Sequence, residues 1–90
     1  MLTLVPSSRF RKDVKRAQKR GKDMVKLKTV VTLLAEQQDL PLEYRDHALR
    51  GDWVGFRDLH IEPDWLLLYR IAGNEVQLAR TGTHSDLFRD

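Results

Sequence analysis

The stretch GFRDLHIEPDWLLLYRIAGNEVQLAR, residues 55–80, decides the fold class of this chain. It contains three segments with strand-like character, residues 55–61, 65–71 and 75–80. Glu62-Pro63-Asp64 and Ala72-Gly73-Asn74 separate them and have the composition of turns. Strands joined by such short turns pair antiparallel. The stretch therefore predicts a meander of three strands.

Two helical patterns precede the meander, after a short apolar strand at residues 2–5. Pro6-Ser7-Ser8 supplies a turn and a helix N-cap, and Gly21 is a plausible end for the first helix. The second helix is expected to begin near Lys22 and to continue until residues 39–41. The apolar stripes are Phe10, Val14 and Ala17 in the first helix, and Met24, Leu27, Val31 and Leu34 in the second.

The order strand, helix, helix and meander predicts an α+β domain that occupies residues 1–90. We expect two antiparallel helices to pack on one face of a mostly antiparallel sheet and to leave the other face free. Alternation along the first meander strand places Leu59 and Ile61 on one face, and Phe56, Asp58 and His60 on the opposite one. Residues 35–44 read as a simple connection.

Length and composition exclude several classes of protein. Ninety residues bury one small core, and 41% hydrophobic with 32% charged residues is typical of a globular domain. No apolar run approaches the ~20 residues that cross a bilayer, and residues 1–10 lack the apolar stretch of a signal peptide. The chain has no cysteine, so it has no disulfide and no thiolate metal site. We expect a cytoplasmic protein without a membrane partner.

The net charge of +3 conceals a strong asymmetry along the chain. Residues 1–30 carry a net charge of +8, and the remaining sixty residues carry −5. A basic N-terminal face suits a polyanion such as nucleic acid, although a lysine-rich helix can also serve solubility alone. The basic residues of this face are Arg9, Arg11, Lys12, Lys15, Arg16, Lys19, Arg20, Lys22, Lys26 and Lys28.

The groups suited to acid–base chemistry lie in the second half of the chain: His47, His60 and His84, with Asp64 and Arg80. Cleavage of RNA without a metal requires a base for the ribose 2′-hydroxyl, an acid for the leaving 5′-oxygen and a cation for the phosphorane. Histidine, aspartate and arginine can supply all three functions, although a single histidine is more often a surface residue. The same histidines and Asp64 could bind zinc, but their spacing matches no familiar zinc motif, so no metal or cofactor is predicted.

Two aromatic or cationic side chains near the C-terminus have an ambiguous orientation. Strict alternation places Arg80 with Val76 and Leu78 toward the core, so a bulge before Arg80 is required if it is to face a substrate. Phe88 can either pack on the sheet or stack against a base.

Three separated segments carry a resemblance to a known family: residues 47–53 (HALRGDW), 55–65 (GFRDLHIEPDW) and 80–84 (RTGTH). Together they resemble YafQ-type toxins of the RelE superfamily. The resemblance implies a RelE-like fold and a bacterial toxin of a toxin–antitoxin pair, an endoribonuclease that cuts messenger RNA in the A site of the 70S ribosome. It also implies a cognate antitoxin, a toxin that is monomeric alone, and a higher-order complex of the two.

The resemblance also suggests roles for particular residues, since His47, His60, Asp64, Arg80 and His84 match functional positions of the family. On this hypothesis His84 is the general acid, Asp64 or His60 takes the 2′-hydroxyl proton, and Arg80 stabilises the phosphorane. His47 completes the set, Phe88 helps to position the RNA, and the basic helices contact ribosomal RNA.

Two alternatives remain open at this point. A ParE-like relative would share the scaffold but inhibit DNA gyrase by binding, without any need for the histidine, aspartate and arginine set. A catalytically silent RNA-binding module would need only the basic N-terminal face.

Overall fold

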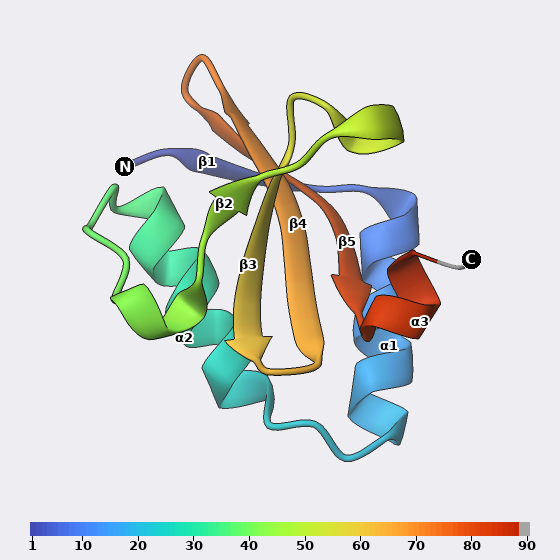
Figure 1. Ribbon diagram of the computed structural model, residues 1–90. Coiled ribbons are helices and arrows are strands. Elements are labelled where there is room, and N and C mark those ends of the chain that lie inside the picture. The colour runs from blue at the N-terminus through green and yellow to red at the C-terminus, as the bar shows by residue number, and fades with distance from the viewer. Residues whose placement is uncertain (89–90) are drawn as a thin grey trace.

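A computed structural model describes residues 1–88 and has the α+β architecture that the sequence predicts (Figure 1). The sheet has the strand order β1-β5-β4-β3-β2, in which β1 runs parallel to β5 and the other pairs are antiparallel. The strands are β1 Thr3–Pro6, β2 His47–Ala48, β3 Arg57–Glu62, β4 Trp65–Ala72 and β5 Glu75–Gly82. The helices are α1 Ser8–Lys19, α2 Met24–Ala35 and the short α3 His84–Leu87, and 3-10 turns occupy Leu42–Tyr44 and Gly51–Trp53.

The two long helices begin at side-chain caps. Ser7 accepts the backbone N–H of Phe10 at 3.0 Å at the start of α1. Asp23 caps α2 in the same way, so this helix begins at Met24 rather than near Lys22. It also ends earlier than predicted, at Ala35, because Gln37 adopts a left-handed conformation with φ of 55°.

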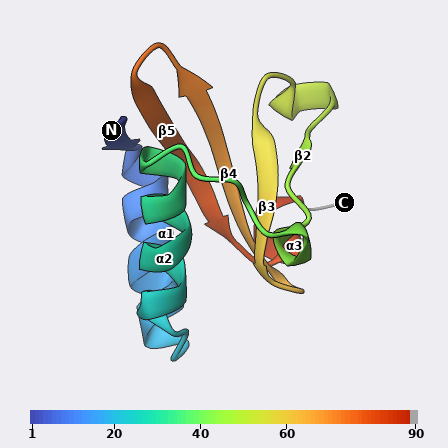
Figure 2. The same cartoon turned by 90° about the vertical axis from the view of Figure 1, so that its left-hand side faces the viewer.

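Helices α1 and α2 form one layer and the sheet a second, as the side view shows (Figure 2). Alternate residues of the central strand β4, namely Trp65, Leu67 and Tyr69, are buried between the layers. Leu59 and Ile61 of β3 belong to the same apolar cluster, which confirms the alternation predicted for that strand. The helices contribute Phe10, Ala17, Leu27, Val30 and Leu34 to this cluster.

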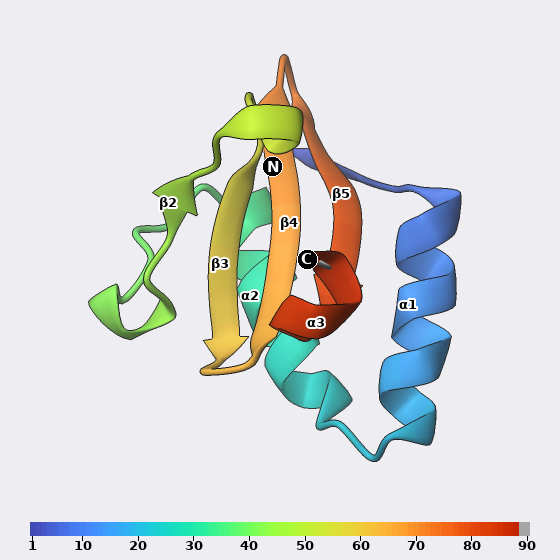
Figure 3. The same ribbon diagram turned by 45° about the vertical axis from the view of Figure 1, so that its right-hand side comes forward.

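The prediction that the other face of the sheet is free was wrong. Leu66 and Leu68 of β4 point to this face and are fully buried, and Leu87 of α3 is buried against them. Leu49, Trp53, Ala79 and Phe88 pack around them, and α3 lies beside β5 (Figure 3). Residues 65–69 are apolar or aromatic at every position, which is the pattern of a strand covered on both faces.

The predicted connection, residues 35–44, ends in the 3-10 turn Leu42–Tyr44, and the segment continues to β3 with further structure. Its two-residue strand β2 pairs with β3, so that His47 lies opposite Asp58 and Ala48 opposite Arg57. Two residues are too few to produce an alternation that sequence reasoning can detect. Tyr44 of the preceding turn packs against the helix-side cluster, which fixes this segment beside the sheet.

Strand β5 contains a bulge just before Arg80, but the bulge does not turn Arg80 away from the helices, because its guanidinium group donates to Asp13 on α1. Tyr69 of β4 pairs with Leu78, whereas the adjacent Leu68 pairs with Arg80, so Ala79 is an extra residue on β5. The hydroxyl of Ser7 donates to the carbonyl oxygen of Ala79 at 2.8 Å and so ties the bulge to the start of α1. Within residues 1–88 there is no helix with the length and apolar character needed to span a membrane.

Candidate active site

The three histidines form a row, although they come from three different elements. His47 lies on β2, His60 on β3 and His84 at the first position of α3. The ring centroid of His60 is 5.9 Å from that of His47 and 5.8 Å from that of His84. The fold thus brings together side chains that are separated by up to 37 positions in the sequence.

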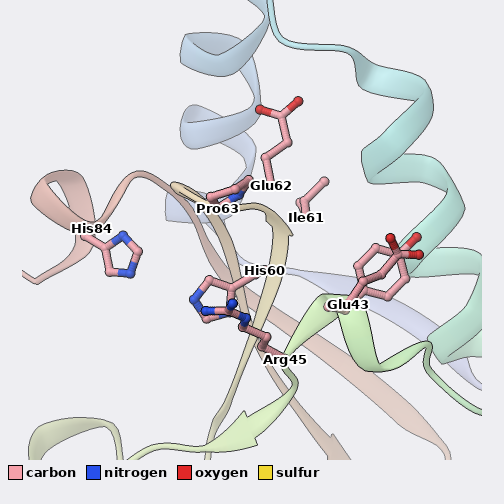
Figure 4. Close-up of a pocket in the computed structure, with 8 residues that line it drawn as sticks. Glu43, Arg45, His60, Ile61, Glu62, Pro63 and His84 are labelled. Carbon is pink, nitrogen blue, oxygen red and sulfur yellow. The ribbon is translucent and has the colours of Figure 1, made fainter.

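A cavity of about 460 Å³ opens beside this row (Figure 4). Its volume is in the range of small-ligand sites, so it has room for a nucleotide. His60 and His84 both line it, and the turn before β2 and the end of β3 supply the rest of the wall. The other lining residues are Glu43, Tyr44, Arg45, Ile61, Glu62 and Pro63.

Asp64 fixes the orientation of His84. Its Oδ1 accepts a hydrogen bond from the backbone N–H of His84 at 2.9 Å and lies 2.6 Å from the ring Nδ1. These hydrogen bonds, that of the backbone N–H first, lower the pKa of the Asp64 carboxyl group. An ionised carboxylate can only accept, so Nδ1 of His84 carries a proton and Nε2 is left for chemistry.

His47 is also held by its surroundings. Its Nδ1 donates to the carbonyl oxygen of Arg45 at 2.8 Å, and its Nε2 lies 3.7 Å from Oδ2 of Asp58. Because a carbonyl oxygen cannot donate, the Nδ1 atom carries the proton in this arrangement. The Nε2 atom of His47 therefore faces the carboxylate.

Asp58 is a site residue that sequence reasoning did not select. It is only 4% exposed, its Oδ1 has no hydrogen-bond partner in the described part of the chain, and burial raises the pKa of its carboxyl group. Histidines 47, 60 and 84 oppose this shift through their charge. The available signal was the alternation on β3, which places Asp58 on the same face as His60.

His47, Asp58 and His60 offer ligand atoms that all lie within 4.8 Å of one another, a grouping that could hold a metal ion. The sequence spacing argued against such a group, because two separated segments supply it. The pairing of His47 with Asp58 across β2 and β3 brings them together. Nitrogen and carboxylate ligands of this kind suit zinc and other transition metals.

Arg80 lies apart from the histidine row. Its Nε and Nη2 donate to the two carboxylate oxygens of Asp13 on α1 at 2.7 and 3.1 Å, and its side chain is 10% exposed. The hydrogen bond with Asp13 raises the pKa of the guanidinium group. Among the contacts of residues 1–88, none joins Arg80 to a histidine, so the assigned catalytic role of Arg80 stays a prediction.

Phe88 ends α3 and is half-buried against the second apolar cluster. Packing on the sheet is thus one of its functions. A role in positioning RNA stays a prediction.

The basic N-terminal face divides into two groups. Arg16 and Arg20 pair with Asp86, and Lys22 and Lys26 pair with Glu62, which lowers the pKa of Glu62. The other six side chains are exposed, and the structure shows no ion pair for them within residues 1–88: Arg9, Arg11, Lys12, Lys15, Lys19 and Lys28.

One of these ion pairs anchors the helix that carries His84. Arg20 donates to both carboxylate oxygens of Asp86 at 2.6 and 3.2 Å, and this contact is the main reason that the pKa of Asp86 lies far below its usual range. Asp86 also accepts the backbone N–H of Thr83 and so completes a capping box at the start of α3. A Cβ on Gly82 would approach Asp86 to 2.9 Å, which explains the glycine at this position. Helix α1 therefore helps to place His84.

Comparisons with known proteins agree with the fold. The family model described as "Bacterial toxin of type II toxin-antitoxin system, YafQ" matches residues 2–89. The chain is 52% identical over 83 residues to the mRNA interferase toxin YafQ of Escherichia coli (strain K12), which covers 91% of this chain and 90% of the relative.

Solved structures of similar proteins include a complex and a metal-bound form. The chain is similar to YafQ in the crystal structure of the E. coli DinJ–YafQ complex, with a TM-score of 0.89, 48% identity and coverage of 98% of this chain and 99% of the other. It is also similar to a metal-bound toxin from Helicobacter pylori, with a TM-score of 0.92, 44% identity and coverage of 98% and 100%. Because the family model matches residues 2–89 and the relative from E. coli is 52% identical, the chain belongs to the YafQ family of bacterial toxins of type II toxin–antitoxin systems.

Proposed function

We propose that this toxin is an mRNA interferase, an endoribonuclease that cleaves messenger RNA in the ribosomal A site by metal-independent acid–base catalysis. The observation that carries the proposal is that His60 and His84 line one cavity, with Asp64 bound to Nδ1 of His84. The relative from E. coli bears the name of an mRNA interferase. Together these features favour a nuclease over a gyrase-binding protein or a silent RNA-binding module.

In the proposed reaction His60 accepts the proton of the ribose 2′-hydroxyl, and the resulting oxygen attacks the adjacent phosphorus. His84, protonated at Nε2, donates that proton to the leaving 5′-oxygen as the P–O5′ bond breaks. The products are a 2′,3′-cyclic phosphate, which hydrolyses to a 3′-phosphate, and a new 5′-hydroxyl.

The neighbours of the two histidines suit this division of roles. Asp64 binds Nδ1 of His84, which fixes the ring and leaves Nε2 for proton transfer, as an acid requires. Because Asp64 is engaged in two hydrogen bonds and its pKa is lowered, it is a weak base, and His60 is the better candidate for that role. His47 packs against the ring of His60 and positions it.

The ribosome supplies the remaining contacts in this proposal. The six exposed basic residues on α1 and α2 (Arg9, Arg11, Lys12, Lys15, Lys19 and Lys28) can bind phosphates of ribosomal RNA, since no carboxylate of the described chain neutralises them. The toxin would then act in the cytoplasm, where ribosomes translate.

A cognate antitoxin is the second proposed partner, by analogy with the DinJ–YafQ complex of E. coli. We expect the toxin alone to be monomeric and to form a higher-order complex with the antitoxin. Light scattering after size-exclusion chromatography of both samples measures these masses. A dimeric toxin, or a complex with one copy of each chain, would contradict the expectation.

Primer extension on a defined messenger in a reconstituted translation reaction tests the nuclease. The wild-type toxin and His84→Ala are compared with and without ribosomes. We expect cuts that require both ribosomes and His84. Cuts on free RNA would retain the chemistry but remove the ribosome from the mechanism, and no cuts in any reaction would refute the proposal.

A further inference from the structure

The candidate site needs a cation for the reacting phosphate, and Arg80 is poorly placed to be that cation. A phosphorane accumulates negative charge, which fixed cations stabilise strongly in a partly enclosed site. Two nitrogens of Arg80 are already bound to Asp13, and its side chain is buried against α1. It is also not among the described residues that line the cavity.

Arg45, in contrast to Arg80, lies at the cavity and has no ion-pair partner among the described residues. It lines the cavity together with His60 and His84, and its side chain overlaps that of His60 in the view of Figure 4. No carboxylate forms an ion pair with it in the described part of the chain. The neighbouring Asp46 is already occupied, since it accepts hydrogen bonds from Arg57 at 3.1 Å and from the hydroxyl of Tyr69 at 2.7 Å.

The charges around the cavity leave Arg45 as its principal cation. It is the single lysine or arginine among the described lining residues. Of the two acidic lining residues, Glu62 is neutralised by Lys22 and Lys26, and Glu43 points away from the histidines in Figure 4. An anion that enters the cavity beside His60 and His84 therefore has Arg45 as the cationic side chain among the described residues of its wall.

The backbone holds Arg45 in an unusual conformation at this place. Its φ of 48° and ψ of 41° are left-handed, a conformation that ordinary side chains adopt only when the surrounding structure enforces it. The 3-10 turn before it and the hydrogen bond from His47 Nδ1 to its carbonyl oxygen supply that constraint. The residue that orients His47 through its backbone thus presents its side chain to the cavity.

We infer that Arg45 is a catalytic residue that binds the scissile phosphate of the RNA between His60 and His84. The inference rests on the proposed nuclease function and adds to it the group that neutralises the phosphate. Arg80 then acts as a structural residue, which joins β5 to α1 through Asp13.

The test compares Arg45→Gln and Arg45→Lys with Arg50→Gln, a control that removes another exposed arginine from the same segment. None of the three substitutions changes a residue that packs in the core, so all three variants should have the melting temperature of the wild type. In single-turnover cleavage on programmed ribosomes, Arg45→Gln should be slower by about 10²-fold, as for the loss of one donor to a transition-state anion. Arg45→Lys should restore most of the rate, because it returns the positive charge, and Arg50→Gln should match the wild type.

Binding of uridine 3′-monophosphate provides a second measurement that does not depend on cleavage. Histidine ring protons of His60 and His84, followed by NMR during the titration, report occupation of the cavity. Arg45→Gln should weaken binding by about tenfold, the usual effect of one charged hydrogen bond. Cleavage and binding by Arg45→Gln within threefold of the wild type would overturn the inference.

The two measurements separate this inference from the proposed function. If the wild-type toxin fails to cut RNA but loses nucleotide binding upon Arg45→Gln, the nuclease proposal fails and the phosphate site stands. If the wild type cuts RNA and Arg80→Gln, rather than Arg45→Gln, removes the activity without changing stability, the cation has been assigned to the wrong arginine.

Discussion

The two faces of the sheet differ in what they bury. The face under α1 and α2 buries a continuous apolar cluster, in which Leu67 and Val76 have no exposed surface. The opposite face combines a small apolar cluster around Leu66 with buried polar groups, since Asp58 Oδ1 and His60 Nδ1 lack hydrogen-bond partners in the described structure. Unpaired buried polar atoms cost stability. One face therefore stabilises the domain, and the other retains groups that are useful for chemistry.

Removal of the His84 side chain should have the largest effect on activity, and it tests whether the face opposite α1 and α2 carries the chemistry. His84→Ala should reduce the rate of cleavage by about 10²–10⁴-fold, the contribution of one proton-transfer group, and leave the fold intact. Single-turnover cleavage and circular dichroism measure the two effects. Ser85→Ala, an exposed neighbour on α3, is the control. Full activity of His84→Ala would show that the general acid is another residue.

Truncation of adjacent leucines on β4 compares the faces directly. Leu67→Ala should lower the free energy of unfolding by about 2–5 kcal/mol, as for other buried leucines, and leave cleavage by folded molecules unchanged. Leu66→Ala should cost less, because its cluster contains only three buried residues in the part of the chain that the structure describes, but it should also slow cleavage by loosening α3. Urea denaturation and cleavage assays below the transition test this. Equal losses of stability and of activity in both variants would remove the distinction between the faces.

The link between α1 and α3 predicts an effect on activity from a residue outside the cavity. Arg20→Gln removes the bidentate partner of Asp86, so His84 should be less well placed and cleavage slower by about tenfold. Lys19→Gln removes a neighbouring charge that forms no ion pair within residues 1–88, and it is the control. The NMR signal of the His84 Nδ1–H, hydrogen-bonded to Asp64, should weaken in Arg20→Gln alone. If both variants slow cleavage equally, the effect of Arg20 is on ribosome binding.

Asp58 predicts a pH dependence of stability. Burial raises its pKa in the folded state, so its contribution is most favourable when it is protonated and is lost as pH rises through that pKa. Asp58→Asn removes this loss. The gain in stability of the variant over the wild type should therefore be larger at pH 7 than at pH 4, by about 1 kcal/mol, the cost of one unpaired polar group. Urea denaturation of both proteins at several pH values measures the difference. A difference that does not change with pH would show that Asp58 is paired in solution.

The smallest expected effect concerns metals. Toxin stripped of metal with EDTA and then dialysed should cleave at an unchanged rate, because the proposed chemistry uses only side chains. Added zinc should slow cleavage by occupying His47, Asp58 and His60. Zinc binding by calorimetry, with Asp58→Asn as the control variant, identifies the ligands. Loss of cleavage on stripping, restored by zinc, would refute the metal-independent mechanism.

The sequence alone determined the features that depend on short-range pattern. The strand-like segments of residues 55–80 with their short turns, and the helical spacing of Phe10, Val14 and Ala17, predict the α+β class. The alternation up to Ile61 in the first meander strand predicts its helix-covered face. The three histidine-bearing motifs indicate the family, and the alternation on β3 places His60 away from the helices. These signals are local, because each repeats within a few residues.

The tertiary structure decided which charged groups meet. Arg80 and Asp13 are 67 positions apart, and Arg20 and Asp86 are 66 apart, so no local pattern predicts either pair. The two-residue strand β2 brings His47 opposite Asp58, and the left-handed Arg45, which directly follows the connection predicted at residues 35–44, lines the cavity. Electrostatic interactions act between whichever groups the folded chain brings within a few ångströms, whereas periodicity reports only on neighbours along the chain.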